Sequence, residues 1–450
     1  MMSKQKGFIA IVAVVILVGV LSVINNSEQQ EQPDNYQPLS IQSWQSKQGT
    51  KVMFVNAPEL PMIDVQLVFD AGSARDGKQP GLAMITNAML DLGAGKWSTD
   101  EIAERFDSIG ARYANDSSRD NATLSLRSLS EAALLDKAIA TFNAILVKPN
   151  FVESEIERIR KQVLISLRNH QQSPGTIAQK TFYQTLYHTH PYATPVLGNS
   201  ESIKNITRQE MQAFYKKYYV ARNAVVAIVG DVSRAQAETL VEKILKGLPK
   251  GKQAVSLPET KAIDEAINVH KDHPSSQTHI LVGQPGMKRG DRDYLPLYVG
   301  NHILGGSGFG SRIVEEIREK RGLAYSSYSY FSPMRVNGPF TMGLQTSNEN
   351  TEQALKLLDE VLREFIKNGP TEEELQHAKK NITGGFALKI DSNKDILAYL
   401  SMIGFYDLPL DYLKTFNQRV EKITRQQIQD AFQRRIDPDK LVTVTVGSAQ

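Results

Sequence analysis

An internal repeat constrains the fold of this chain more than any other feature. The segment ITRQEMQAFYKKYYVARNAVVAIVG (206–230) aligns without a gap on ITRQQIQDAFQRRIDPDKLVTVTVG (423–447), with eight identities in 25 positions. Each copy contains a Thr suited to cap a helix, a short polar turn, and an apolar strand that ends in Gly. A shared ending of this kind predicts two copies of one fold within the chain.

The arrangement of expected helices and strands indicates the fold class. We expect strands at 64–73 and 121–129. We expect helices at 81–92 and 98–110, the second of which begins with a Ser-x-x-Glu capping box. These elements alternate without a strict strand-helix-strand order. The sequence therefore predicts an α+β fold, in which each half is a mostly antiparallel sheet covered by helices.

Weaker echoes of the repeat and a change of composition indicate where the halves divide. NFVESEIERIRKQV (150–163) and GPTEEELQHAKKNI (369–382) each begin a charged helix behind a turn, at a similar distance before the shared ending. Gly, Pro, Lys and polar residues cluster between the two halves. We expect an N-terminal domain at 38–247, a linker at 248–264 and a C-terminal domain at 265–450.

The N-terminus has the pattern of a membrane anchor. Residues 1–6 carry two lysines, and residues 7–24 form an apolar stretch in which Ser22 is the single polar side chain. This order predicts a cytoplasmic end, a transmembrane signal anchor and a polar tether at 25–37, with the rest of the chain outside the cytoplasm. We expect a protein of the bacterial inner membrane whose bulk lies in the periplasm. Secretion to the periplasm after signal cleavage is the alternative, although no clear small-x-small cleavage site is present.

Composition excludes several classes of protein. The net charge is +3, from 52 basic and 49 acidic residues, and no basic patch is evident, so nucleic acid is not an expected partner. The chain has no cysteine, which excludes disulfides, thiolate zinc sites and a cysteine nucleophile. The histidines in HTH (188–190) and HKDHP (270–274) lack a third partner at ligand spacing, so we expect no metal site from them.

Several motifs, taken together and in order, resemble the pitrilysin, insulinase and mitochondrial-processing-peptidase superfamily over residues 38–450. The motifs are the strand ending in AGS, the helix beginning GLA, STDEIAERFDSIGA, HPYATPVLGNSESIKNIT, VVAIVGDV and SRIVEEIREKRGLAYS. The resemblance implies two similar α+β domains that form half of a clamshell. Two such chains would enclose a chamber for peptides.

Catalytic members of this superfamily carry His-x-x-Glu-His on the helix that begins GLA. Histidines at positions i and i+4 share one helical face and bind zinc, while the glutamate polarises the attacking water. Here the two histidine positions hold Met84 and Ala88, and the glutamate position holds Asn87. The third ligand, a glutamate on a later helix, would fall near Ile165. The resemblance therefore implies that this chain binds no catalytic zinc and no other cofactor.

The second half keeps a different part of the site. Catalytic members need an arginine and a tyrosine separated by six residues, and IREKRGLAY supplies Arg318 and Tyr325 at that spacing. Both side chains can donate hydrogen bonds to a scissile carbonyl as negative charge develops on it. Arg312 and Arg321 are neighbouring arginines outside the spacing. The alternative is that Arg318 belongs to an exposed helix end and that Tyr325 packs on the core.

A glycine-rich stretch, LGGSGFGSR (304–312), precedes that helix, with glycines at Gly305, Gly306, Gly308 and Gly310. It is not a phosphate-binding loop, because no Lys-Ser or Lys-Thr follows the glycines. A flexible connection that ends a helix is one interpretation. A mobile lip that admits peptides to the chamber is the other.

The pattern of loss and retention predicts a split enzyme. We expect this chain to be the non-zinc subunit of a heteromeric metalloendopeptidase, inactive alone, with Arg318 and Tyr325 acting at the zinc site of a homologous His-x-x-Glu-His partner. Short or unfolded peptides would be the substrates, added as a strand to a sheet edge in the partner. A non-enzymatic peptide-binding or structural homologue is the alternative. An independent metallopeptidase with other ligands is disfavoured, because no second carboxylate and histidine cluster has ligand spacing.

Overall fold

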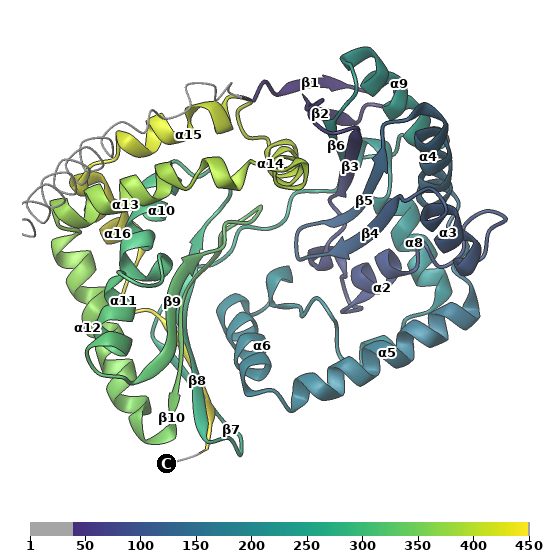
Figure 1. Ribbon diagram of the computed structural model, residues 1–450. Coiled ribbons are helices and arrows are strands. Elements are labelled where there is room, and N and C mark those ends of the chain that lie inside the picture. The colour runs from purple at the N-terminus through teal and green to yellow at the C-terminus, as the bar shows by residue number, and fades with distance from the viewer. Residues whose placement is uncertain (1–38, 449–450) are drawn as a thin grey trace, which may run out of the picture. The chain divides into compact units, whose positions relative to one another are not determined.

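The computed structural model describes residues 39–448, and the chain from Ser40 onward forms one compact unit. This unit contains two β-sheets, each with helices packed on it, as the sequence predicted (Figure 1). The predicted anchor at 7–24 and tether at 25–37 lie outside the described residues. Within the described part of the chain, no helix is both long enough and apolar enough to span a bilayer.

The first sheet has six strands in the order β1-β2-β6-β3-β5-β4. Their bounds are β1 (Gln42–Gln45), β2 (Lys51–Asn56), β3 (Met62–Phe69), β4 (Arg112–Ser117), β5 (Ala122–Leu129) and β6 (Ala224–Gly230). The pairing is antiparallel except between β2 and β6, which run parallel.

The second sheet repeats this arrangement with five strands in the order β7-β11-β8-β10-β9. Their bounds are β7 (Ile267–Asp272), β8 (Gln277–Met287), β9 (Ala324–Phe331), β10 (Gly338–Ser347) and β11 (Val442–Gly447). The one parallel pair is β7 with β11. The two closing strands of the sequence repeat, β6 and β11, thus occupy equivalent places in their sheets. The duplication predicted from the sequence is confirmed.

Helices pack on the faces of both sheets. The first half contributes α2 (Leu82–Ala88), α3 (Thr99–Asp107), α4 (Ala132–Val147), α5 (Glu153–Gln171), α6 (Pro174–Tyr187), α7 (Ser200–Asn205), α8 (Arg208–Tyr218) and α9 (Arg234–Ile244). The second half contributes α10 (Tyr294–Asn301), α11 (Arg312–Val314), α12 (Thr351–Asn368), α13 (Glu372–Gly384), α14 (Asn393–Phe405), α15 (Tyr412–Glu421) and α16 (Arg425–Arg435).

Helices that precede the closing strand are capped as the repeat predicts. The Thr207 and Thr424 side chains each accept a hydrogen bond from the backbone N–H three residues later. The side chain of that later residue accepts a hydrogen bond from the backbone N–H of the threonine. The capping box predicted for the helix at 98–110 is also present, with Ser98 and Glu101 as partners. Each box satisfies two backbone N–H groups that a helix start would otherwise leave without partners.

Each half lends one helix to the other half. Helix α6 packs against β8 and β11 of the second sheet, and α14 packs against β3 and β6 of the first (Figure 1). The strand β6 is buried along its whole length because helices cover both of its faces. Such a strand is expected to be continuously apolar, and AVVAIVG is.

Three predicted elements end earlier than expected. The strand expected at 64–73 ends at Phe69, and the helix expected at 98–110 ends at Asp107. The helix expected at 81–92 ends at Ala88. The next backbone N–H groups, of Met89 and Leu90, bond three residues back, to Thr86 and Asn87, so the chain tightens into turns. Turns of this kind often close an α-helix, and the apolar periodicity continues through them, which is why the sequence pattern overestimated the length.

Candidate functional site

Helix α2, on which zinc ligands would lie, is anchored by an aspartate that precedes it. The backbone N–H groups of Gly81 and Ala83 donate to the two Asp76 carboxylate oxygens, each at 2.7 Å. Gly81 has a φ of +91°, and a side chain there would meet the Gly198 backbone at 3.1 Å. Burial raises the pKa of Asp76 to about 7, although both hydrogen bonds act to lower it. These contacts position the helix without a metal ion.

The side chains at the four zinc-related positions do not fit a zinc ion. Met84 and Ala88 are half-buried on α2. Asn87 is 2% exposed, and its Nδ2 donates to the Tyr219 hydroxyl at 3.0 Å. Ile165, on α5, is 54% exposed. Zinc in proteins is bound by imidazole, thiolate or carboxylate groups, and these positions offer none. Across the described residues, no group of three or more His, Asp or Glu side chains could hold a metal ion.

A partly buried hydrogen-bond network lies around Asn87. The Asn115 Nδ2 donates to the Asn87 backbone oxygen and to Asp91 Oδ1, each at 3.0 Å. Burial raises the pKa values of Asp91 and of the neighbouring Tyr113. These polar groups hydrogen-bond to one another. The network therefore explains the polar residues around α2 by folding alone, without a ligand.

Arg318 and Tyr325 lie together, as their spacing predicts. Arg318 belongs to a π-helical turn (Glu315–Glu319), Gly322 has a φ of +63°, and Tyr325 follows in β9. The Arg318 guanidinium carbon lies 4.9 Å from the centre of the Tyr325 ring and 4.4 Å from that of Phe309. Tyr325 is 85% exposed and Phe309 70%. The guanidinium is thus stacked against two aromatic rings at the surface.

Arg318 differs from its two neighbours in how its N–H groups are engaged. Arg312 donates to Glu374 at 2.7 Å and also bonds Glu364. Arg321 donates to Glu316 at 2.5 Å. In the described part of the chain, Arg318 makes one ion pair, at 3.4 Å with the exposed Glu319. Of these three arginines, Arg318 is the one least engaged by carboxylates in the described part of the chain.

A β-bulge accounts for the exposure of Tyr325. Leu344 pairs with Ser327 and Thr346 pairs with Ala324, so two residues of β9, Tyr325 and Ser326, face the single residue between them on β10. An extra residue of this kind re-aims a side chain. The alternative that Tyr325 packs on the core is therefore wrong.

The glycine-rich stretch has two different roles. A Cβ at Gly305 would lie 2.6 Å from the Ser329 backbone nitrogen, and one at Gly306 would lie 2.6 Å from the Asn301 side chain, so both are needed for close packing. Gly308 and Gly310 have φ values of +69° and +89° and open space around them. Phe309, between them, is the loop residue that covers Arg318. Phe309 was not predicted as a site residue, although an aromatic residue among glycines was a visible clue.

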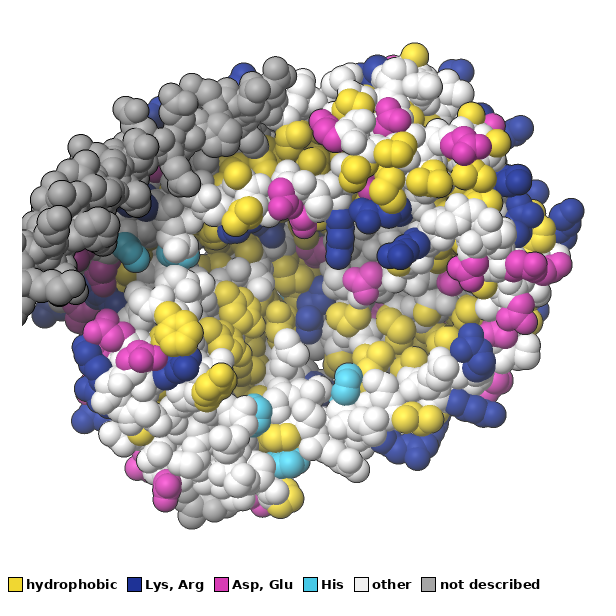
Figure 2. Space-filling model, viewed as in Figure 1, with side chains coloured by type: hydrophobic (Ala, Val, Ile, Leu, Met, Phe, Trp, Pro, Cys, Tyr) yellow, Lys and Arg dark blue, Asp and Glu magenta, His cyan; other side chains and the backbone are white. Residues whose placement is uncertain are grey.

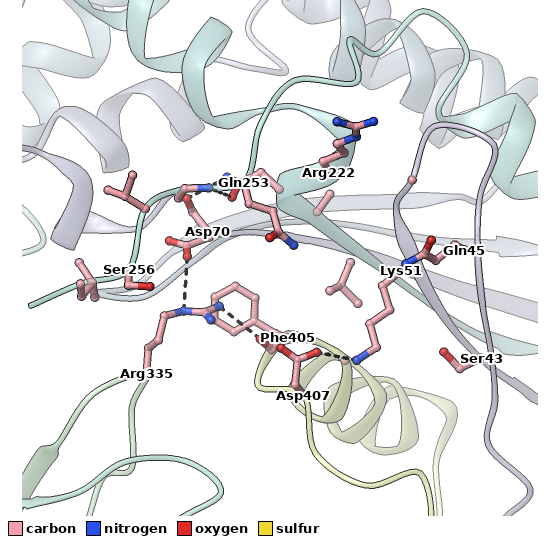
Figure 3. A pocket seen from close by; sticks show the side chains of 18 of the residues that line it. Ser43, Gln45, Lys51, Asp70, Arg222, Gln253, Ser256, Arg335, Phe405 and Asp407 are labelled. Carbon is pink, nitrogen blue, oxygen red and sulfur yellow. Dashed lines mark hydrogen bonds and ion pairs between the residues drawn. The ribbon is translucent and has the colours of Figure 1, made fainter. Parts of the chain in front are cut away.

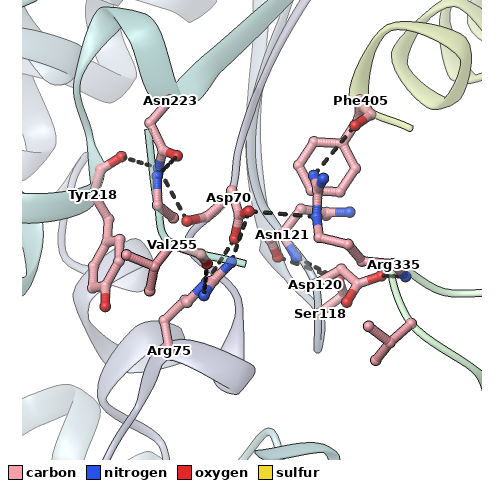
Figure 4. Close-up of polar contacts among 12 residues, drawn as sticks. Asp70, Arg75, Ser118, Asp120, Asn121, Tyr218, Asn223, Val255, Arg335 and Phe405 are labelled. Atoms are coloured by element: carbon pink, nitrogen blue, oxygen red, sulfur yellow. Dashed lines mark hydrogen bonds and ion pairs between the residues drawn. The ribbon is translucent and has the colours of Figure 1, made fainter. Parts of the chain in front are cut away.

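A cavity of about 710 Å³ lies where the two halves meet. Figure 3 shows Lys51 pointing at Asp407, with the Nζ and Oδ1 atoms 2.7 Å apart, and Arg335 pointing at Asp70. Asp70 also accepts two bonds from Arg75, at 2.7 and 2.8 Å (Figure 4). No motif marks this cavity, since Lys51 and Asp407 are 356 residues apart along the chain.

A buried carboxylate joins the halves beside that cavity. Asp120, 3% exposed, accepts hydrogen bonds from the Tyr192 hydroxyl at 2.5 Å, the Tyr406 hydroxyl at 2.9 Å and the Arg335 backbone N–H at 2.8 Å. Burial and the Asp120 charge raise the pKa values of both tyrosines, so their hydroxyls remain protonated donors. We call Asp120, Tyr192, Arg335 and Tyr406 the junction.

The space between the halves is hollow on one side. Figure 2 shows a hollow whose floor carries many hydrophobic side chains, with charged side chains mainly around its rim. A surface of this composition suits apolar parts of a ligand better than a highly charged one.

Family comparisons agree with this architecture. The model described as Insulinase (Peptidase family M16) matches residues 51–200, and the model described as Peptidase M16 inactive domain matches residues 205–382. The first match covers the altered helix α2, and the second covers Arg318 and Tyr325.

Two curated relatives span most of the chain. A Helicobacter pylori protein named non-peptidase homolog YmxG is 28% identical over 394 residues, which cover 86% of this chain and 90% of that protein. A Bacillus subtilis protein named uncharacterized zinc protease YmxG is 24% identical and covers 86% of this chain and 93% of its own length.

Two solved structures have a similar fold. A Pseudomonas fluorescens structure titled peptidase M16 inactive domain superposes with a TM-score of 0.89 at 41% identity, covering 92% of this chain and 98% of that one. A Helicobacter pylori protease shares the fold, with a TM-score of 0.83 at 21% identity over 91% of this chain and all of that one. The resemblance inferred from the motifs is confirmed: the chain belongs to peptidase family M16, the insulinase family, as a non-catalytic member without the zinc-binding side chains.

Proposed function

We propose that this chain is the non-zinc subunit of a heteromeric M16 peptidase and that it supplies Arg318 and Tyr325 to the zinc site of a partner. The observation that carries the proposal is how few partners the Arg318 guanidinium has. This guanidinium lies against two exposed rings and makes one ion pair among the described residues, at 3.4 Å with the exposed Glu319, whereas Arg312 and Arg321 each hydrogen-bond carboxylates at 2.7 Å or less.

The chemistry follows from these two side chains. A guanidinium and a phenol hydroxyl donate hydrogen bonds to a peptide carbonyl, and those bonds strengthen as negative charge develops on the oxygen. Removal of one such donor lowers kcat by roughly 100- to 1000-fold in other hydrolases. Stacking on Phe309 limits the freedom of Arg318 before substrate arrives, which lowers the entropy lost on binding.

The partner in this proposal is a homologous M16 chain that carries His-x-x-Glu-His. Its zinc and glutamate would activate water, and this chain would close over the site from the other side. The substrate is a short or unfolded peptide in extended form. The N-terminal segment would hold the complex at the outer face of a bacterial inner membrane, with both subunits in the periplasm.

Reconstitution tests this proposal. The full-length chain, the His-x-x-Glu-His homologue from the same organism and their equimolar mixture are assayed with fluorogenic peptides, and zinc is measured in each. The proposal requires a zinc-free, inactive chain and cleavage that depends on the mixture. A mixture no more active than the homologue alone would contradict it.

A second candidate is a peptide-binding protein without enzymatic activity. The observation in its favour is strand β4, which pairs only with β5 among the described strands and leaves its other edge open beside α2. An open edge can accept an extended peptide as an added strand. Peptide binding by the chain alone, unaffected by Arg318→Ala, would favour this candidate.

A further inference from the structure

A second cavity lies against the inner face of the second sheet, and its lining includes Ser326, the residue that follows Tyr325. It has a volume of about 280 Å³ and lies between α6 and strands β8, β9 and β10. We call it the tyrosine pocket. Its lining includes Gly175, Gln179, His279, Ser326, Tyr328 and Tyr330.

Aromatic rings form the wall of the tyrosine pocket on β9. The Tyr328 and Tyr330 rings are stacked, with centres 5.6 Å apart and planes inclined by 19°. A Cβ at Gly343 on β10 would lie 2.6 Å from Tyr328, so the absent side chain makes room for that ring. Gly175 at the start of α6 likewise lets the His279 ring approach, because a Cβ there would lie 3.1 Å from it.

The lining of the tyrosine pocket carries no charge. None of its residues is Asp, Glu, Lys or Arg. Burial, together with the nearby His273, lowers the pKa of His279, which keeps that ring neutral at pH 7. Burial raises the pKa values of Tyr328 and Tyr330, so both phenols stay protonated. A charged group that entered this pocket would lose hydration without gaining a counter-charge.

The tyrosine pocket and the Arg318 site share adjacent residues of β9. Ser326, which lines the pocket, directly follows Tyr325, and the bulge in β9 leaves both side chains exposed. A peptide whose carbonyl lies at Arg318 and Tyr325 would therefore have a nearby side chain at the pocket.

Pocket size limits the ligand. Sites for whole small molecules usually measure about 300–1000 Å³, and this cavity is slightly below that range. It suits a single large side chain. We propose that the tyrosine pocket binds an uncharged aromatic or long aliphatic side chain of the peptide, and so sets a preference for apolar residues. The inference rests on the proposed function, because the peptide backbone is held at Arg318 and Tyr325.

Two kinds of probe test the inference. The first is N-acetyl-L-phenylalaninamide against N-acetyl-L-alaninamide, which occupies the pocket without needing the Arg318 site. The second is a set of acetylated Gly/Ser decapeptides with one central Phe, Ala or Glu. Binding to the full-length chain in lipid nanodiscs is measured by calorimetry or ligand-observed NMR. We expect the Phe probes to bind roughly tenfold or more tightly than the Ala probes, and the Glu decapeptide to bind no better than Ala.

Two exposed lining positions provide the variants. Ser326→Trp fills the pocket and should reduce the Phe preference to within about twofold. Gln179→Glu places a carboxylate in the lining and should weaken the Phe probes. Gln184→Glu is the matched control, because Gln184 is exposed on the same helix outside the lining. It should leave the preference unchanged.

The outcomes separate this inference from the proposed function. Equal binding of the Phe and Ala probes, or a preference that survives Ser326→Trp, would overturn the pocket assignment, even if the reconstituted enzyme is active. A preference that is present and lost in Ser326→Trp would support the pocket, whether or not the mixture cleaves peptides.

Discussion

Replacing Asp120 with asparagine tests how the two halves are held together. The carboxylate accepts three hydrogen bonds, two of them from Tyr406 and Arg335 in the second half of the chain. Asparagine keeps one acceptor oxygen and presents an NH₂ group to the donors on the other side. At least one bond to a charged acceptor is lost, and such bonds contribute about 1.5–3 kcal/mol each. We expect Asp120→Asn to lower the free energy of unfolding by about 2–3 kcal/mol.

Urea denaturation followed by tyrosine and tryptophan fluorescence measures this change. Tyr406→Phe removes one donor and leaves the carboxylate with two others, so its effect should be smaller, about 1 kcal/mol. The matched control is Asp116→Asn on β4, which makes the same substitution at an exposed position and should change stability by less than about 0.5 kcal/mol. An effect of Asp120→Asn on stability as small as that of Asp116→Asn would refute the role given to this carboxylate.

Three further predictions concern stability. Asp76 keeps its proton to about pH 7 in the folded chain but only to about 3.8 when unfolded, so its contribution to stability should fall as the pH rises from about 4 to about 7. Thermal melts across this range should show that fall in the wild type relative to Asp76→Asn. A Cβ at Gly283 would lie 2.0 Å from the Phe340 backbone oxygen, so Gly283→Ala should cost about 3 kcal/mol in urea denaturation, whereas Gly384→Ala, with open space around it, should be neutral or stabilising. EDTA should leave the melting temperature of the chain unchanged, because hydrogen bonds of Asp76, Asn87 and Asn115, not a metal, hold α2; a drop of several degrees would contradict this.

Local patterns predicted the repeated parts of the fold. Thr207 and Thr424 are followed by helical and then apolar segments, and each signal depends only on neighbouring residues, so both units were visible in the sequence. Arg318 and Tyr325 also lie close together, as their spacing predicts. One turn and one bulge are all that separate them along the chain.

Long-range packing could not be predicted in this way. The exchange of α6 and α14 between halves depends on which sheet face each helix meets, and the hydrophobic periodicity of a helix does not name its partner. The junction at Asp120 joins residues up to 286 positions apart, and no spacing rule connects them. The contact between Phe309 and Arg318 depends on the path of the loop, which the sequence pattern does not predict.

The most direct test of the account is the kinetic effect of Arg318 in the reconstituted complex. Steady-state kinetics compare the wild type with Arg318→Ala, and with Arg321→Ala as the control, since Arg321 is a neighbouring arginine that Glu316 already engages. We expect Arg318→Ala to lower kcat by roughly 100-fold or more, while complex formation and the zinc content of the partner stay the same and Arg321→Ala stays near the wild type. Equal rates for Arg318→Ala and Arg321→Ala would contradict the account.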